Sequence, residues 1–380
     1  MTFSLPDFPW DSLAPVKERA SSVATDDGLG LVDLSVGTPV DPTPEVVQEA
    51  LRSASDAPGY PQTWGTPALR EAVATWFAAR RGVPDVDPDG VLPTVGSKEL
   101  VAWLPTLLGL GAGDVVGFPS AAYPTYDVGA RLAGATPKVV DGLAALGPLT
   151  PSTTPKLLWL NSPGNPTGQV LGVEHLAKVV AWARRHGVVV ASDECYAELD
   201  WRTDRGAGEP PTTPSILDPR VSGDSHEGLL CVYSLSKQSN LAGYRAAFVA
   251  GDPALVGRLL EVRKHAGMIV PWPVQVALTA AVGDAGHVEA QKAVYAARRA
   301  TLLEGVRAFG LEVTHSDAGL YLWATAGEDA WTTLGRLAER GLLAAPGTFY
   351  GRAGQQHVRI ALTASDERIA AAAARLGGGS

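Results

Sequence analysis

Short apolar runs and amphipathic segments alternate through the middle of the chain. Residues 156–161 and 187–192 are apolar runs that each end in a polar turn, and residues 173–186 between them have helical spacing. This order predicts a strand, a helix and a second strand parallel to the first. Further strand candidates are residues 115–118, 230–234 and 246–250. From residue 93 to about residue 270 the pattern therefore predicts an α/β fold, a mostly parallel sheet flanked by helices on both faces.

The two ends of the chain differ from this middle part. Residues 1–40 are expected to be irregular, whereas residues 311–380 alternate strands with short helices, which predicts a smaller α+β domain. Helical spacing is also present in residues 43–54, 66–81, 272–280 and 287–309. Because a chain of 380 residues exceeds what one core usually supports, we expect two domains. The predicted large domain is residues 41–270, and the small domain is residues 1–40 with 271–380.

Lys237 lies among groups that suit a phosphate. It follows the hydroxyls of Ser234 and Ser236, and Arg245 comes eight residues later. A lysine amine can form a Schiff base with an aldehyde, while hydroxyls and a guanidinium can hold a phosphate. One small molecule, pyridoxal phosphate, requires both. The S-x-x-K spacing is also the nucleophile motif of penicillin-binding proteins, but the S-D-N and K-T-G strings that those enzymes require do not occur here.

Two polar residues come just after the carboxyl ends of the predicted parallel strands. Asn165 comes after residues 156–161, and Asp193 comes after residues 187–192. Ligands of parallel sheets bind beyond the carboxyl ends of the strands. A carboxylate at that place can pair with a protonated pyridine nitrogen, which makes pyridoxal phosphate an electron sink. Asn165 and Tyr196 could donate hydrogen bonds to the phenolate oxygen of the cofactor. Asn165 also suits the turn around it on backbone grounds alone.

With these markers the chain resembles the fold-type I pyridoxal phosphate-dependent aminotransferases, the aspartate aminotransferase superfamily. The markers are the string N-x-P-G-N-P-T-G at residues 161–168, D-E-x-Y at residues 193–196, and S-x-S-K at residues 234–237 with Arg245. They occur in the order of that family. The resemblance implies its fold, a mostly parallel sheet with a smaller α+β domain, and transamination with pyridoxal phosphate between amino acids and 2-oxo acids.

The resemblance also implies roles for individual residues. Lys237, Asp193 and Tyr196 are the implied catalytic residues, and Lys237 would act as general base and acid once the substrate has displaced it from the cofactor. The implied cofactor-binding residues are Tyr60, Gly96, Ser97, Lys98, Tyr123, Asn165, Asp193, Tyr196, Ser234, Ser236, Lys237 and Arg245. The implied substrate-binding residues are Gly37, Asn165 and Arg359. For the ring that stacks on the cofactor, Tyr126 remains an alternative to Tyr123.

One of these residues carries an expectation about assembly. In the family, the tyrosine that matches Tyr60 crosses the dimer interface to the phosphate of the neighbouring cofactor, so a homodimer is expected. The alternative is an ordinary loop aromatic that packs with Trp64.

The substrate is indicated by longer segments. Residues 59–70, 93–105 and 234–245 most resemble the actinobacterial N-succinyldiaminopimelate aminotransferases, which use glutamate in the synthesis of lysine and peptidoglycan precursors. Residues 238–240, Gln-Ser-Asn, depart from the Thr-Tyr/Phe-Gly of commoner relatives. A general aspartate or aromatic aminotransferase and a C–S β-lyase remain alternatives. A cofactor-binding transcription regulator is disfavoured because the family motifs begin by Gly37, before a winged-helix domain would fit.

Composition excludes several other classes. A net charge of −9 and a pI near 5.3 argue against a nucleic-acid surface. No apolar stretch reaches the length of a membrane span, and the amino end has no signal-peptide pattern, so cytoplasmic residence is expected. The seven histidines lack paired spacing, which predicts no metal site, and two cysteines indicate thiols. The glycine-rich residues 109–114 follow a predicted helix and precede a predicted strand. A dinucleotide-binding loop has the opposite order, because it follows a strand and begins a helix.

Overall fold

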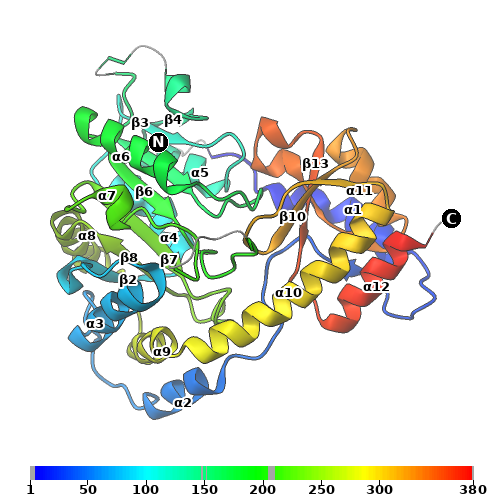
Figure 1. Cartoon of the computed structure of the whole chain (residues 1–380), viewed down its shortest axis with the longest axis horizontal. Helices are drawn as coiled ribbons and strands as arrows, with labels where there is room; N and C mark the ends of the chain where they lie inside the picture. The colour runs from blue at the N-terminus through cyan, green and yellow to red at the C-terminus, as the bar shows by residue number, and fades with distance from the viewer. Residues whose placement is uncertain (1–4, 147–148, 151, 204–209, 379–380) are drawn as a thin grey trace.

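The computed structural model of the protein describes residues 5–146, 149–150, 152–203 and 210–378. Figure 1 shows a larger sheet with its helices in one part of the molecule and a smaller sheet in the other. The long helix α10 (Ala285–Ala308) runs from one part to the other. Within the described ranges, no helix combines the length and the apolar character that crossing a membrane requires.

The larger sheet has seven strands in the order β2-β8-β7-β6-β5-β3-β4. The strands are β2 (Val91–Val95), β3 (Val115–Phe118), β4 (Thr136–Val139), β5 (Leu157–Asn161), β6 (Val189–Asp193), β7 (Leu229–Ser234) and β8 (Ala246–Gly251). Strand β8 pairs antiparallel with β2 and β7, and the other neighbouring pairs are parallel. The predicted α/β fold with a mostly parallel sheet is therefore confirmed, and all five strand candidates named from the sequence are present.

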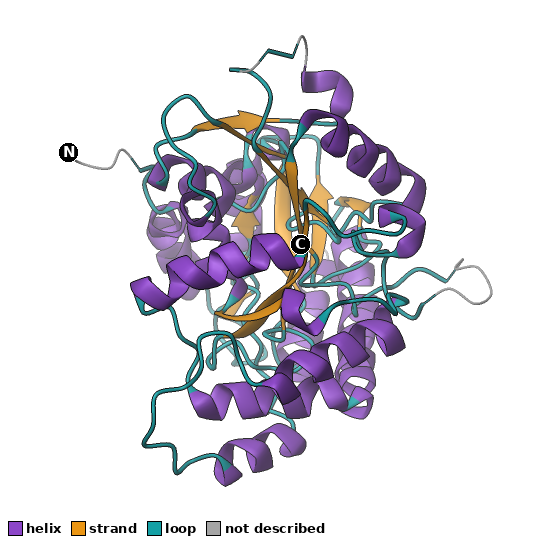
Figure 2. Ribbon diagram, turned by 90° about the vertical axis from the view of Figure 1, so that its left-hand side faces the viewer, coloured by secondary structure: helices purple, strands orange, loops and turns teal. Residues whose placement is uncertain are grey.

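Helices lie on both sides of this sheet (Figure 2). The helical segments of this part are α2 (Glu45–Ser53), α3 (Pro67–Trp76), η2 (Phe77–Arg81), η3 (Pro88–Gly90), α4 (Ser97–Leu107), α5 (Thr125–Leu132), η4 (Leu143–Leu146), α6 (Val173–His186), α7 (Pro219–Ser222), α8 (Pro253–Ala266) and α9 (Trp272–Gly283). Helix α6 has the predicted bounds. It ends at Gly187, whose φ of 62° is the left-handed conformation that commonly terminates helices. The helix predicted for residues 66–81 is present as α3 followed by the π-helical segment η2.

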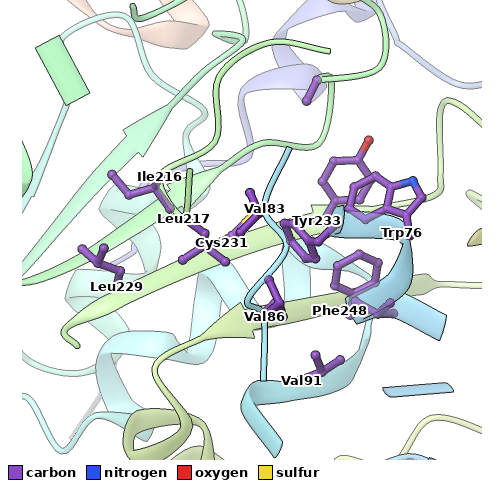
Figure 3. Packing of buried hydrophobic residues seen from close by; sticks show 14 of the residues in the cluster. Trp76, Val83, Val86, Val91, Ile216, Leu217, Leu229, Cys231, Tyr233 and Phe248 are labelled. Atoms are coloured by element: carbon purple, nitrogen blue, oxygen red, sulfur yellow. The ribbon is translucent and has the colours of Figure 1, made fainter. Parts of the chain in front are cut away.

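The two faces of the larger sheet pack against different cores because side chains alternate along each strand. On β7 the odd-numbered residues 229–233 belong to one core, and Leu230 and Val232 belong to the other. Figure 3 shows the first core, in which the ring centre of Trp76 lies 4.6 Å from that of Tyr233. Packing on both faces holds the parallel strands β5, β6 and β7 so that their carboxyl ends lie at one edge of the sheet.

The smaller sheet is antiparallel, with the order β12-β13-β10-β9. Its strands are β9 (Glu312–His315), β10 (Tyr321–Thr325), β12 (Ala345–Pro346) and β13 (His357–Ala361), and a separate parallel pair joins β1 (Val32–Asp33) to β11 (Leu342–Leu343). The remaining helical segments are η1 (Pro9–Leu13), α1 (Ala14–Ser21), α11 (Ala330–Ala338), η5 (Gly347–Tyr350), η6 (Arg352–Gly354) and α12 (Asp366–Gly377).

The expectation that residues 1–40 are irregular is wrong for η1 and β1, and also for the short helix α1. In this short helix only Ala20 is buried, so its sequence carries little periodicity. The helix forms where it packs against α11, and tertiary contact of this kind stabilises short helices that are marginal alone. At the other domain boundary, the core of the larger sheet includes Val274 and Leu278 of α9. The division into residues 41–270 and residues 1–40 with 271–380 stays a prediction.

Candidate active site

A cavity of about 510 Å³ lies where the carboxyl ends of β5, β6 and β7 face strands β10 and β13 of the smaller sheet. Its lining residues are Phe8, Trp10, Val36, Gly37, Thr38, Ser97, Lys98, Tyr123, Asn161, Asn165, Asp193, Cys195, Tyr196, Ser234, Ser236, Lys237, Ala242, Arg245, Tyr321 and Arg359. Every site residue predicted from the sequence is in this lining except Gly96 and Tyr60. The position matches the ligand site expected at the carboxyl ends of parallel strands.

Lys237 lies in the turn that follows β7. Its side-chain amine donates a hydrogen bond to the carbonyl oxygen of Gly37, which belongs to the segment after β1. Burial lowers the pKa of Lys237, and the positive charges of Arg359 and Arg245 act in the same direction. A lysine with a lowered pKa presents more neutral amine near pH 7, and the neutral amine is the form that attacks an aldehyde.

Asp193 ends β6 and is buried. The hydroxyl of Tyr126 donates to its Oδ2 at 3.0 Å, and the backbone N–H of Cys195 donates to its Oδ1 at 3.3 Å. Burial raises the pKa of Asp193. The next residue, Glu194, forms a buried ion pair with Arg81 at 2.7 Å, which fixes the turn after the strand. A buried carboxylate of this kind favours a cationic partner in the cavity.

The two tyrosines proposed as stacking rings have different positions. Tyr123 lines the cavity, whereas Tyr126 is fully buried behind it and stacks on Trp159 with ring centres 4.9 Å apart. Tyr126 is instead the hydrogen-bond donor that orients Asp193. The geometry therefore leaves Tyr123 as the ring of the two that faces a ligand.

Arg359 reaches the cavity from β13. Its Nη1 donates to the side-chain oxygen of Asn165 at 3.0 Å, and its Nη2 donates to the carbonyl oxygen of Ser35 at 2.6 Å. The backbone N–H of Asn165 is held in turn by the side-chain oxygen of Asn161 at 2.7 Å. Among the described residues, Nε of Arg359 has no hydrogen-bond partner and no carboxylate pairs with the group. A buried guanidinium that lacks a carboxylate partner suits an anionic group of a substrate.

A second cationic region lies at the start of α4. Gly96 has φ 77°, and a Cβ at this position would lie 2.1 Å from Nη2 of Arg245, so only glycine allows the guanidinium to approach the turn. The N–H of Gly96 donates to the carbonyl oxygen of Arg245 at 2.8 Å. Ser97 begins the helix, and Ser234 donates to Ser236 at 2.8 Å beside it. Hydroxyls, a guanidinium and a helix N-terminus are together groups that suit a phosphate.

Tyr60 is the predicted site residue that the structure does not bring to the cavity. Its side chain is 99% exposed, and it does not contribute to the lining. The structure therefore places Tyr60 outside the cavity that the other predicted residues of the same chain form.

Three lining residues, Phe8, Trp10 and Tyr321, carried no signal in the sequence. Three more were not named individually: Val36 and Thr38 flank the predicted Gly37, and Ala242 lies within residues 234–245. Phe8 and Trp10 come from the amino end, which was expected to be irregular, and Tyr321 is one apolar position of β10. Cys195, which lies inside the 193–196 motif, is a buried free thiol that also lines the cavity.

The donor set fits pyridoxal phosphate. Arg245 with the hydroxyls suits the phosphate, Lys237 suits the aldehyde, and the buried Asp193 suits a protonated ring nitrogen. The cavity volume is within the range of small-molecule sites.

Comparison with known proteins agrees with this geometry. The family model described as "Aminotransferase class I and II" matches residues 30–376. The chain is 57% identical over 372 residues to 4-dedimethylamino-4-oxo-anhydrotetracycline transaminase OxyQ of Streptomyces rimosus, covering 98% of this chain and 99% of that protein. It is also 57% identical over 373 residues to a "probable aminotransferase" of Mycobacterium tuberculosis, covering 98% of this chain and 85% of that protein.

A solved structure extends the likeness to the fold. The "probable N-succinyldiaminopimelate aminotransferase" from Thermus thermophilus matches with a TM-score of 0.81 and 29% identity, covering 97% of this chain and 99% of that one. The chain therefore belongs to the class I and II aminotransferases and is a pyridoxal phosphate-dependent enzyme with the fold-type I architecture.

Proposed function

We propose that the enzyme transfers the amino group of glutamate to N-succinyl-2-amino-6-oxopimelate, in the synthesis of diaminopimelate and lysine. The observation that carries this proposal is the buried guanidinium of Arg359, with which no carboxylate of the described residues pairs, because donor and acceptor both present an α-carboxylate to it. Lys98 is exposed in the lining and adds a cation for a second carboxylate. The binding of the cofactor by Lys98, expected from the sequence, also stays a prediction. The two buried free thiols support a reducing, cytoplasmic location.

The residues of the cavity have different roles in the proposed transamination. Pyridoxal phosphate supplies an electron sink when it is bound. Arg359 holds the substrate carboxylate and so orients the Cα–H bond, and orientation of this kind contributes a large part of the rate. The amine of Lys237, with its lowered pKa, can take the Cα proton and return it. With the cofactor bound, Asp193 would hold a proton on its ring nitrogen, and Tyr196 would donate a hydrogen bond to its phenolate oxygen.

A second candidate acceptor is a polycyclic ketone. The relative from Streptomyces rimosus, 57% identical, is named for 4-dedimethylamino-4-oxo-anhydrotetracycline. The rings of Phe8 and Trp10, 5.6 Å apart, stand in the cavity lining and could stack on a flat substrate.

A glutamate-coupled assay separates these candidates. We expect kcat/KM for N-succinyl-2-amino-6-oxopimelate to exceed that for oxaloacetate and phenylpyruvate by about tenfold or more, a difference that side-chain contacts can supply. The oxo-anhydrotetracycline is the rival acceptor in the same panel. Release of pyruvate and ammonia from cystathionine, without use of an acceptor, would identify a β-lyase instead. Higher kcat/KM with any rival acceptor contradicts the proposal.

We also propose that the active unit is a homodimer with shared sites. The support is Tyr60, which is almost completely exposed and is not in the lining of its own cavity. We propose that this residue binds the phosphate of the partner subunit's cofactor.

Mixed dimers of Tyr60→Phe and Lys237→Ala chains test this assembly. If sites are shared, the site that retains Lys237 also receives an intact Tyr60, so its affinity for pyridoxal phosphate should return to the wild-type value. If Tyr60 acts within its own chain, the same site keeps the Tyr60 defect and no recovery appears. Sedimentation velocity that shows an active monomer would also contradict a shared site.

A further inference from the structure

Tyr321 is a buried residue of the cavity lining. It begins β10 and is 4% exposed. Its hydroxyl lies 3.1 Å from that of Tyr196, and the guanidinium carbon of Arg359 lies 3.9 Å from the centre of its ring. One side chain therefore contacts both the tyrosine proposed to bind the cofactor and the arginine proposed to bind the substrate.

Gly37 is a third residue that packs against Tyr321. A Cβ on Gly37 would lie 2.2 Å from the hydroxyl oxygen of Tyr321, so the backbone at this position packs directly on the phenol. The carbonyl oxygen of the same glycine accepts the hydrogen bond of the Lys237 amine. The Tyr321 hydroxyl thus lies where the elements that carry Lys237, Tyr196 and Arg359 meet.

We propose that Tyr321 is a positioning residue for transamination, whose hydroxyl donates a hydrogen bond to Tyr196 while its ring supports Arg359. This inference rests on the proposed role of Tyr196 as a donor to the cofactor. A phenol has one proton. If Tyr196 directs its proton to the phenolate oxygen of pyridoxal phosphate, the proton between the two tyrosines has to come from Tyr321.

The surroundings favour this direction of donation. Burial alone would raise the pKa of Tyr321, but the positive charges of Arg359 and Lys237 bring it below its usual value. Burial and the neighbouring Tyr321 raise the pKa of Tyr196. The more acidic phenol of a pair is the better donor, and a donor chain of this kind strengthens each of its hydrogen bonds.

Other titratable groups also act on this phenol or respond to it. The titratable and charged groups around Tyr321 are Lys237, Tyr196, Arg359, Tyr123, Tyr295 and Tyr350. Of the three outer tyrosines, Tyr295 offers a matched control, because it is buried in the same core and its hydroxyl has no hydrogen-bond partner among the described residues.

The experiment removes single hydroxyls from the holoenzyme. Tyr321→Phe, Tyr196→Phe, the double variant and the control Tyr295→Phe are loaded with pyridoxal phosphate, and the absorbance of the bound cofactor is titrated with pH without substrate. A hydrogen bond to the phenolate oxygen favours the more negative form of the cofactor. Losing it should therefore move the midpoint to higher pH. We expect a smaller alkaline shift in Tyr321→Phe than in Tyr196→Phe, and none in the control.

The double variant tests whether Tyr321 acts through Tyr196. Its midpoint should equal that of Tyr196→Phe alone, because residues in one chain of hydrogen bonds are not additive. In Tyr321→Phe, kcat should fall about tenfold with little change in KM for glutamate, since the ring under Arg359 remains. In Tyr321→Leu, which removes the ring as well, KM should rise.

Two results would overturn the proposal. One is an unshifted midpoint in a Tyr321→Phe enzyme that binds a full equivalent of cofactor, and the other is additive shifts in the double variant. The expected midpoint shifts do not depend on which acceptor the enzyme uses, because no acceptor is present in the titration. Failure of the proposed substrate is therefore detected separately, in the panel of acceptors.

Discussion

Replacing Lys237 by alanine should abolish transamination, with a loss of about 10⁴-fold or more, because the amine serves both as the covalent attachment of the cofactor and as the proton carrier at Cα. The variant should still bind pyridoxal phosphate, since Arg245, Ser97 and the hydroxyls after β7 remain. Borohydride reduction of the wild-type holoenzyme should fix the cofactor to Lys237, because an imine is reduced to a stable amine. Peptide mapping of the reduced protein identifies the labelled residue.

The cavity contains a matched control for this experiment. Lys98 also lines the cavity, but it is exposed and comes from the start of α4. Lys98→Ala should keep the borohydride label on Lys237 and should retain turnover well above that of Lys237→Ala. Recovery of the label on Lys98 or on any other lysine would contradict the assignment.

Asp193→Asn should lower turnover by about 150- to 5,000-fold in a folded, cofactor-loaded enzyme. An amide of the same shape cannot hold a proton on the ring nitrogen, and a buried charge that loses its partner costs about 3–5 kcal/mol, which corresponds to that factor. Single-turnover kinetics measure the rate of the chemical step. The absorbance of the bound cofactor verifies that the variant is loaded.

Two comparisons make this prediction specific. Tyr126→Phe removes a hydrogen bond to the same carboxylate at 3.0 Å and should cost far less, about tenfold. Loading Asp193→Asn with N-methylated pyridoxal phosphate, whose ring nitrogen carries a fixed positive charge, should restore part of the lost turnover. Near-normal turnover of Asp193→Asn with ordinary cofactor would show that another group protonates the ring.

Local patterns in the sequence were enough to determine the sheet and one end of the site. Apolar runs of strand length, separated by amphipathic helices, specify parallel strands covered on both faces, and polar residues directly after such runs must lie at the carboxyl edge. Asn165, Asp193 and Lys237 each follow a predicted strand closely, and the structure places all three in one cavity. The local rule was sufficient because each position depends on its own strand.

The tertiary structure alone decided how the two ends of the chain complete this site. Lys237 and the carbonyl oxygen of Gly37 are 200 positions apart, and Arg359 and the carbonyl oxygen of Ser35 are 324 positions apart. Tyr321 has the pattern of an ordinary strand residue, and its contact with Tyr196 spans 125 positions. Periodicity records which face of an element is buried but not which distant element covers it. The pairing of the smaller sheet with the carboxyl edge of the larger one therefore had to be seen in the folded chain.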